Sequence, residues 1–132
     1  MSFIGKEYKF VKQENFDGFL KSAGVPEDKI ERILQFQPSQ TLLKDGDTYT
    51  YVNVTPRGKK ETQFKLGVEF DDVIGSDTAV KSTYTIDGNT VTQVAKSKDG
   101  TATFKREYNG DDLVVTITND RWDGVAKRYY KA

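Results

Sequence analysis

Two kinds of hydrophobic spacing divide the chain into a short helical part and a long strand-forming part. Between residues 15 and 35 the apolar side chains recur at helical spacing. They are Phe16, Phe19, Leu20 and Ala23, followed by Ile30, Ile33 and Leu34. Gly24 is a C-terminal stop for the first helix, and Pro26, followed by two acidic residues, stands where a second helix begins. The pattern predicts a short helix-turn-helix pair.

From residue 38 onward, short polar–apolar alternations are separated by turn sequences. These are KDGD at 44–47, PRGKK at 56–60, IGSD at 74–77, DGN at 87–89, KDG at 98–100, NGDD at 109–112 and DG at 123–124. Asp-Gly and Asn-Gly accept positive φ at low cost and favour hairpins. With one strand before the helices, the pattern predicts about ten antiparallel strands in an all-β, up-and-down meander. Closure into a barrel removes the edges of such a sheet.

A barrel of this size predicts an internal cavity. About eight strands give an interior that side chains fill or that holds one small ligand. Around ten strands enclose more space than 132 residues with a hydrophobic fraction of 36% would fill.

Two strands predict arginine side chains inside the barrel. In ATFKREY, residues 102–108, the face with Phe104, Arg106 and Tyr108 is largely apolar, whereas the other face is polar. The last stretch, VAKRYYKA, is polar on both faces. Because one face carries two lysines, we expect the face with Ala126, Arg128 and Tyr130 to point inward. A register shifted by one residue would instead turn Lys127 and Tyr129 inward.

A buried arginine needs an acceptor, because an unpaired buried cation costs several kcal/mol. The alternations show no clear inward carboxylate to serve as an internal partner. A guanidinium matches the geometry of a ligand carboxylate, and a phenol adds a second donor. We therefore interpret Arg106 and Arg128 as candidates for binding an acidic head, and ordered water around both is the simpler alternative.

Composition narrows the possible functions. The length is that of one domain, residues 1–132, and the charge is balanced by 20 basic and 20 acidic residues, which disfavours nucleic acid as a partner. Cysteine and histidine are both absent, which removes disulfides, thiolate nucleophiles, Cys/His metal sites and Ser-His catalysis. The start, MSFIGKEYKF, lacks the apolar run of a signal peptide. We expect a soluble cytosolic domain that needs no metal or cofactor.

The sequence resembles the intracellular lipid-binding proteins of the calycin superfamily, specifically the fatty acid-binding proteins. The resemblance covers essentially the whole chain. It rests on ENFDGFLKSAGV at 14–25, FKLGVEFDD at 64–72, VKSTYTIDGN at 80–89, KREYNGDDL at 105–113 and VAKRYYK at 125–131. It implies a flattened ten-stranded barrel, a β-clam of two nearly orthogonal sheets capped by the helix pair, with a long-chain fatty acid inside.

The resemblance also implies which residues contact the ligand. An Arg-x-Tyr pair near the C-terminus, here Arg128 with Tyr130, would hold the carboxylate together with Arg106 and Gln40. Residues implied for the tail are Phe16, Leu20, Val25 and Pro38, to which the inward face of residues 102–108 adds Phe104 and Tyr108. Arg57 stands where the family commonly carries a phenylalanine at its portal.

Other functions remain open at this point. A retinoic acid carrier would use the same head group, and another hydrophobic carboxylate would fit as well. An enzyme without histidine or cysteine would need paired carboxylates, but Asp71 and Asp72 stand beside a turn, where a solvated loop is expected. The helix pair could contact anionic lipid transiently through Lys21, Lys29 and Arg32. We expect a monomeric, non-enzymatic carrier of a long-chain fatty acid of the palmitate or oleate class.

Overall fold

The computed structural model describes residues 3–35, 37–56, 58–74, 78–98 and 100–132. The predicted turns at 56–60, 74–77 and 98–100 include residues outside these ranges, and Arg57 also lies outside them. The helices are α1 (Phe16–Ser22) and α2 (Glu27–Leu34). The strands are β1 (Glu7–Glu14), β2 (Ser39–Asp45), β3 (Thr48–Thr55), β4 (Gly58–Lys65), β5 (Phe70–Ile74), β6 (Thr78–Asp87), β7 (Thr90–Ser97), β8 (Gly100–Asn109), β9 (Asp112–Asn119) and β10 (Trp122–Lys131).

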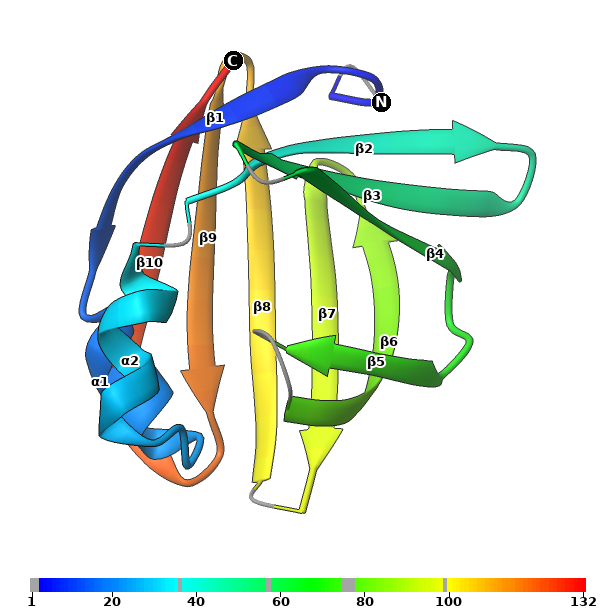
Figure 1. The fold of residues 1–132 in the computed structure, drawn as a ribbon. Helices are drawn as coiled ribbons and strands as arrows, with labels where there is room; N and C mark the ends of the chain where they lie inside the picture. Colours follow the sequence, from blue (N-terminus) through cyan, green and yellow to red (C-terminus); the bar gives the residue numbers. More distant parts are fainter. Residues whose placement is uncertain (1–2, 36, 57, 75–77, 99) are drawn as a thin grey trace.

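The strands form one antiparallel, nearly closed barrel in the order β4-β3-β2-β1-β10-β9-β8-β7-β6-β5. Figure 1 shows β2 and β3 running across the direction of β6 to β9, with both helices at one end. Strand β1 joins the two halves, because it pairs with β2 through Tyr8↔Gln40 and with β10 through Gln13↔Arg128. The predicted fold, a ten-stranded up-and-down barrel with a helix-turn-helix cap, is confirmed.

Three predicted hairpins share one turn geometry. In each hairpin, two unpaired residues connect the two strands, and the first of these two residues is a glycine with φ near +60°. The glycines are Gly46 at 64°, Gly88 at 61° and Gly110 at 61°. Type II′ turns place glycine at this position, and their twist matches that of the flanking strands. The Asp or Asn before each glycine is the last residue of its strand, so glycine alone supplies the positive φ.

The predicted turn at residues 123–124 is wrong. Both residues belong to β10, and the chain reverses earlier, where Asn119 pairs with Trp122. The register then shifts between Trp122 and Ala126, as in a β-bulge. A Cβ on Gly124 would lie 2.4 Å from the Trp122 ring, so glycine permits the close packing of this ring on the strand. The bulge also sets which face of the following residues points inward.

Aromatic packing anchors the helix pair to the barrel. Phe19 of α1 is 1% exposed, and its ring lies 5.7 Å from that of Phe104 on β8 and 6.3 Å from that of Trp122 on β10. On the opposite side, Phe64 stacks on Tyr84 at 4.0 Å and connects β4 with β6. In the described parts of the chain, neither helix is long and apolar enough to cross a membrane.

Candidate functional site

The C-terminal strand presents an arginine to the interior. Ala126, Arg128 and Tyr130 are buried, at 0%, 8% and 5% exposure, whereas Lys127 and Tyr129 lie on the outer face and are partly exposed. The register with Arg128 inward is therefore the one that the chain adopts. The alternative that turned Lys127 and Tyr129 inward is wrong, because after the register shift between Trp122 and Ala126 the strand turns Ala126, Arg128 and Tyr130 inward.

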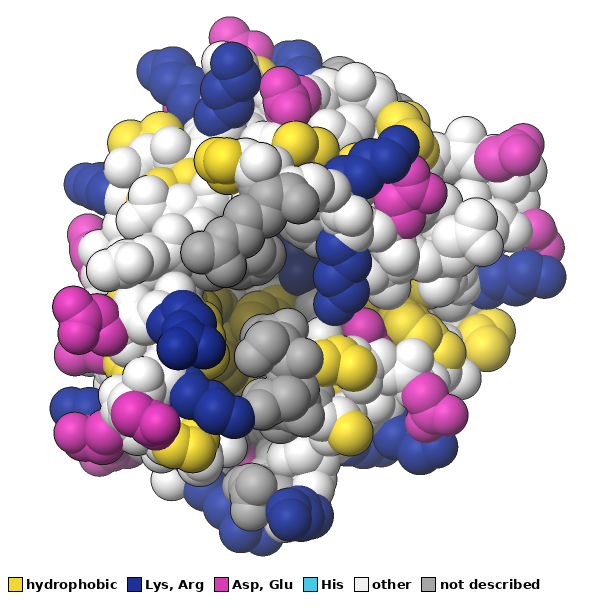
Figure 2. All heavy atoms as spheres, viewed as in Figure 1, with side chains coloured by type: hydrophobic (Ala, Val, Ile, Leu, Met, Phe, Trp, Pro, Cys, Tyr) yellow, Lys and Arg dark blue, Asp and Glu magenta, His cyan; other side chains and the backbone are white. Residues whose placement is uncertain are grey.

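A cavity of about 230 Å³ lies between the helix pair and the strands. Nine of the ten residues predicted to contact a ligand line it: Phe16, Leu20, Val25, Pro38, Gln40, Phe104, Arg106, Arg128 and Tyr130. Figure 2 shows this face of the molecule hollowed, with hydrophobic side chains inside the hollow and Lys or Arg side chains around it. The described chain thus encloses a site of the kind that binds small hydrophobic molecules.

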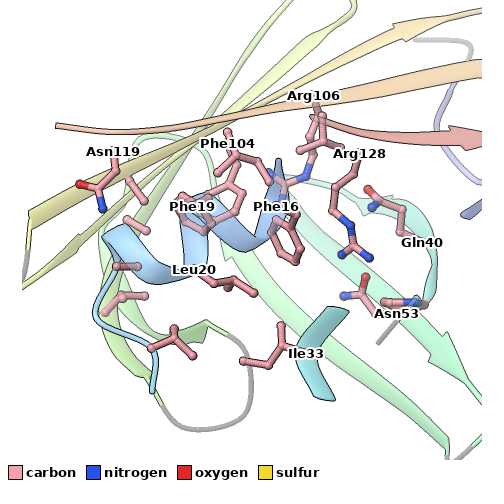
Figure 3. A pocket seen from close by; sticks show the side chains of 18 of the residues that line it. Phe16, Phe19, Leu20, Ile33, Gln40, Asn53, Phe104, Arg106, Asn119 and Arg128 are labelled. Carbon is pink, nitrogen blue, oxygen red and sulfur yellow. The ribbon is translucent and has the colours of Figure 1, made fainter. Parts of the chain in front are cut away.

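The cavity carries its described arginines at one end and is largely apolar along its length, with the amide of Asn119 at the other end. Figure 3 shows the head of Arg128 beside Gln40 and Asn53 at one end, with Arg106 close behind. Aromatic and aliphatic side chains from both helices and from β8 form the middle of the wall. Such an arrangement suits an elongated ligand with an acidic head and a hydrocarbon tail.

Arg128 lies among aromatic rings. Its guanidinium carbon is 4.6 Å from the centre of the Phe16 ring, 4.8 Å from that of Phe10 and 5.9 Å from that of Tyr130. Burial lowers the pKa of the Arg128 guanidinium, although arginine remains protonated in proteins at neutral pH. The ring faces attract this cation, and its dry surroundings strengthen its attraction for an anion.

Arg106 combines a hydrogen bond to Gln93 with two buried nitrogens that find no acceptor in the described part of the chain. Its Nη2 donates to Gln93 Oε1 at 2.9 Å, and the guanidinium lies 4.9 Å from the centre of the Tyr51 ring. Its Nε and Nη1 are buried without an acceptor among the described residues. Burial raises the pKa values of Tyr51 and Tyr84, which therefore remain neutral phenols beside the cation. The site thus has a charged donor that requires an oxygen from a ligand or from water.

A second, smaller cavity of about 160 Å³ adjoins the first behind Arg106. The two share Gln40, Asn53, Lys60, Phe104 and Arg106. The smaller one is also lined by Asp72, Gln93 and the tyrosines that surround Arg106. The cavities are therefore neighbouring parts of one interior, the second of them more polar.

Asp72 corrects the prediction that no carboxylate points inward. It lies on β5 rather than in a solvated loop, and its Oδ2 accepts from Ser82 Oγ at 3.0 Å. Its neighbour Asp71 is exposed and forms an ion pair of 2.7 Å with Lys81, as expected for the solvent face. Strand alternation from Phe70 could have placed Asp72 inward, but its nearness to a turn favoured the loop interpretation.

Tyr108, the tenth predicted residue, is buried but is not among the residues that line either cavity. Its ring stacks on Phe3 at 4.1 Å, and its hydroxyl lies 3.0 Å from that of Tyr51. The inward alternation of β8 is correct, but the N-terminal segment covers this end of the barrel. Tyr108 therefore supports the wall behind Arg106.

Several polar wall residues were not predicted. Asn53 pairs with Gln40 across β2 and β3, and Gln93 pairs with Phe104 across β7 and β8. Alternation from Tyr51 and from Val91 places both on inner faces, so period-two spacing was the signal available for them. In the parts of the chain that the structure describes, no group of three or more acidic, His or Cys side chains could hold a metal ion.

Comparison with known proteins gives consistent matches over nearly the whole chain. Residues 5–123 match the model of the lipocalin / cytosolic fatty-acid binding protein family. Fatty acid-binding protein 1 of Manduca sexta is 59% identical over 132 residues, which cover 100% of both chains. The solved structure of the fatty-acid-binding protein isolated from Manduca sexta superposes with a TM-score of 0.94 at 59% identity, covering 98% of this chain and 99% of that one. A Schistosoma mansoni fatty acid binding protein in complex with arachidonic acid gives a TM-score of 0.90 at 29% identity, over 98% and 95% of the two chains.

Proposed function

The chain belongs to the lipocalin / cytosolic fatty-acid binding protein family, and from this premise we propose that it binds a long-chain fatty acid non-covalently inside its barrel. Relatives named fatty acid-binding proteins at 59% identity support this function, as does the shared fold of a solved complex with arachidonic acid. The observation that carries the proposal is Arg106, whose buried Nε and Nη1 adjoin an apolar-lined cavity and have no acceptor among the described residues.

We propose that Arg128 and Tyr130 hold the carboxylate, with Arg106 and Gln40 completing its surroundings. A planar guanidinium can donate two parallel hydrogen bonds to a carboxylate, and a phenol or an amide can add one more. Three of these residues line the cavity at its polar end in Figure 3, on β2, β8 and β10. An ionised head would thus meet charge and donors that a neutral head cannot use fully.

The apolar wall would supply most of the affinity. Each methylene removed from water contributes about 0.8 kcal/mol, so a sixteen-carbon tail contributes on the order of 10 kcal/mol before association and ordering costs. Side chains proposed to contact the tail are Phe16, Leu20, Val25, Pro38 and Phe104. Affinity of about micromolar or tighter follows.

Retinoic acid is the second candidate ligand, because it combines the same head with a hydrophobic body. Isothermal titration of the delipidated protein with palmitate, retinoic acid and hexadecan-1-ol tests the proposal. We expect palmitate to bind at least about tenfold more tightly than the alcohol, because charge-assisted hydrogen bonds are roughly twice as strong as neutral ones. Equal affinity for palmitate and the alcohol would exclude a site for a charged head. A clear preference for retinoic acid over palmitate would make retinoic acid the proposed ligand.

We further propose a role in transport rather than catalysis, carried out by a cytosolic monomer. Transient contact of the helix pair with anionic membranes would aid ligand transfer, through Lys21, Lys29 and Arg32. Reversing these charges should slow transfer of a fluorescent fatty acid to anionic vesicles but not to neutral ones. Unchanged rates to anionic vesicles would reject the membrane contact.

A further inference from the structure

A chain of hydrogen bonds connects Arg106 to a partly buried carboxylate on the edge strand β5. Arg106 Nη2 donates to Gln93 Oε1 at 2.9 Å, and Gln93 Nε2 donates to Ser82 Oγ at 3.0 Å. Ser82 Oγ donates to Asp72 Oδ2 at 3.0 Å, and Gln93 Nε2 also lies 3.4 Å from this oxygen. Ser82 is fully buried and Gln93 is 4% exposed. We call these four residues the Arg106–Asp72 relay.

The relay has a fixed direction. Gln93 presents its carbonyl oxygen to a guanidinium and its amide nitrogen to two oxygen atoms. Reversing the amide would oppose donor to donor at Arg106 and acceptor to acceptor at Asp72. The amide is therefore oriented by a cation on one side and an anion on the other.

Asp72 takes part as an acceptor at both oxygens. Besides the contacts to Oδ2, its Oδ1 accepts from the backbone N–H of Val73 at 2.8 Å. All three groups around it are donors, which is the environment of an ionised carboxylate. The side chain thus places a negative charge at a defined position on the wall of the smaller cavity.

The described residues around the interior carry charges of both signs. Among the described residues that line the two cavities, the charged side chains are Arg106, Arg128, Lys60 and Asp72. Lys60 is exposed to solvent, and its Nζ donates to Val73 O at 3.3 Å. Water screens Lys60, so its charge acts weakly on the interior. Asp72 thus offsets part of the positive charge that the described arginines, Arg106 and Arg128, present to a ligand.

We propose that Asp72 makes the cavity selective for ligand heads that carry one negative charge over heads that carry two. The inference rests on the proposed function and names the class of head that it accepts. A carboxylate or a sulfate ester brings one negative charge into the cavity, whereas a dianionic phosphate monoester brings a second, which the Asp72 carboxylate on the wall repels. Because Asp72 is only partly exposed, water screens this repulsion less than it would at the protein surface.

The test uses two amphiphiles that share a tail and a tetrahedral head but differ in charge. Hexadecyl sulfate carries one negative charge, and at pH 8 hexadecyl phosphate carries nearly two, since its second pKa is about 6. Isothermal titration below the concentration of micelle formation gives the ratio of the phosphate Kd to the sulfate Kd. The ratio is measured for the native protein, Asp72→Asn, Gln93→Glu and the control Asp71→Asn.

We expect the native protein to bind the phosphate about tenfold more weakly than the sulfate. Asp72→Asn should lower this ratio by about tenfold, whereas Gln93→Glu, which adds a negative charge beside Arg106, should raise it by a similar factor. Asp71→Asn should leave it within about twofold, because Asp71 faces solvent and pairs with Lys81.

Equal ratios in the native protein and Asp72→Asn would overturn the inference and would show that Asp72 serves packing alone. If Asp72→Asn fails to fold by its melting curve, Gln93→Glu decides, and an unchanged ratio there overturns the inference equally. Palmitate binding by the native protein, measured in the same series, distinguishes failure of this inference from failure of the proposed function. A native protein that binds neither palmitate nor the sulfate would refute the proposed function itself.

Discussion

Replacing Arg106 by methionine should raise the folding stability of the ligand-free protein and lower its affinity for the ligand. In the native protein the guanidinium is held by one charged hydrogen bond to Gln93 and by the Tyr51 ring. The hydrogen bond contributes about 1.5–3 kcal/mol, and the contact with the ring contributes about 1–2 kcal/mol. Two costs oppose them. Desolvation of the cation costs several kcal/mol, and the two buried donors that have no acceptor in the described part of the chain cost about 1–3 kcal/mol each when unmet.

These costs exceed the gains even after about 1–3 kcal/mol is added for the buried Gln93 Oε1, which loses its donor, so Arg106→Met should raise the free energy of unfolding of the delipidated protein by about 1–2 kcal/mol. For a chain of 132 residues, this corresponds to a rise in Tm of roughly 3–8 °C. The same variant should bind palmitate about 30- to 100-fold more weakly, since truncating one partner of a buried charge pair costs about 2–3 kcal/mol.

Thermal melting of delipidated protein and isothermal titration with palmitate measure the two effects. Lys105→Met is the matched control, because Lys105 is the neighbouring residue on the exposed face of β8 and should change neither quantity. A lower Tm for Arg106→Met together with unchanged palmitate affinity would refute the reasoning, since Arg106 would then be a structural residue.

Three further predictions concern the cavity wall. Arg128→Gln should weaken palmitate binding by about 10- to 100-fold, as titration calorimetry would show; an equal loss in the outer-face control Lys127→Gln would point to a general disturbance of β10. Tyr108→Phe removes the hydroxyl contact with Tyr51 and should lower the free energy of unfolding, measured in urea, by about 1 kcal/mol. Its palmitate affinity should stay within about twofold of the native value. A large loss of affinity would place Tyr108 in the binding site. Since the pKa values of Tyr51 and Tyr84 are raised in the folded protein, unfolding releases protons above about pH 10 and stability should fall as pH rises beyond this point. Urea midpoints at pH 8, 10 and 11 test this, and a slope that Tyr51→Phe does not reduce would contradict it.

Local spacing predicted the architecture because the fold repeats one simple unit. Asp-Gly and Asn-Gly sequences marked hairpins where a glycine supplies positive φ, and alternation along β8 placed Phe104 and Arg106 inside. The same signals failed where packing overrides local preference. Gly124 lies in a bulge rather than a turn because the Trp122 ring packs against it, a contact that depends on how residues 122 to 126 fold back on themselves.

The sequence was enough to predict the arginines of the site but not the side chains that hydrogen-bond to them. An arginine on an apolar face is conspicuous, whereas Asp72 looks like part of a solvated acidic pair until β5 is known to place alternate residues on opposite faces. Its bond to Ser82 joins strands β5 and β6, and the link to Arg106 passes through Gln93 on β7. Spacing along one strand carries no information about such contacts between strands. Tyr108 shows the converse, since its inward direction was correct but Phe3 covers its ring.

The most direct test of the account is the ionisation of the bound head itself. Palmitate labelled with ¹³C at its carboxyl carbon reports its charge through the chemical shift, which can be followed by NMR as pH is lowered. Guanidinium groups nearby favour the charged form, so the carboxyl carbon of bound palmitate should keep the shift of a carboxylate at pH values where exposed carboxyl groups, with pKa values of about 4, have become protonated. A bound carboxyl that titrates like an exposed one would mean that the head lies in solvent, away from Arg106 and Arg128, and would contradict the central claim.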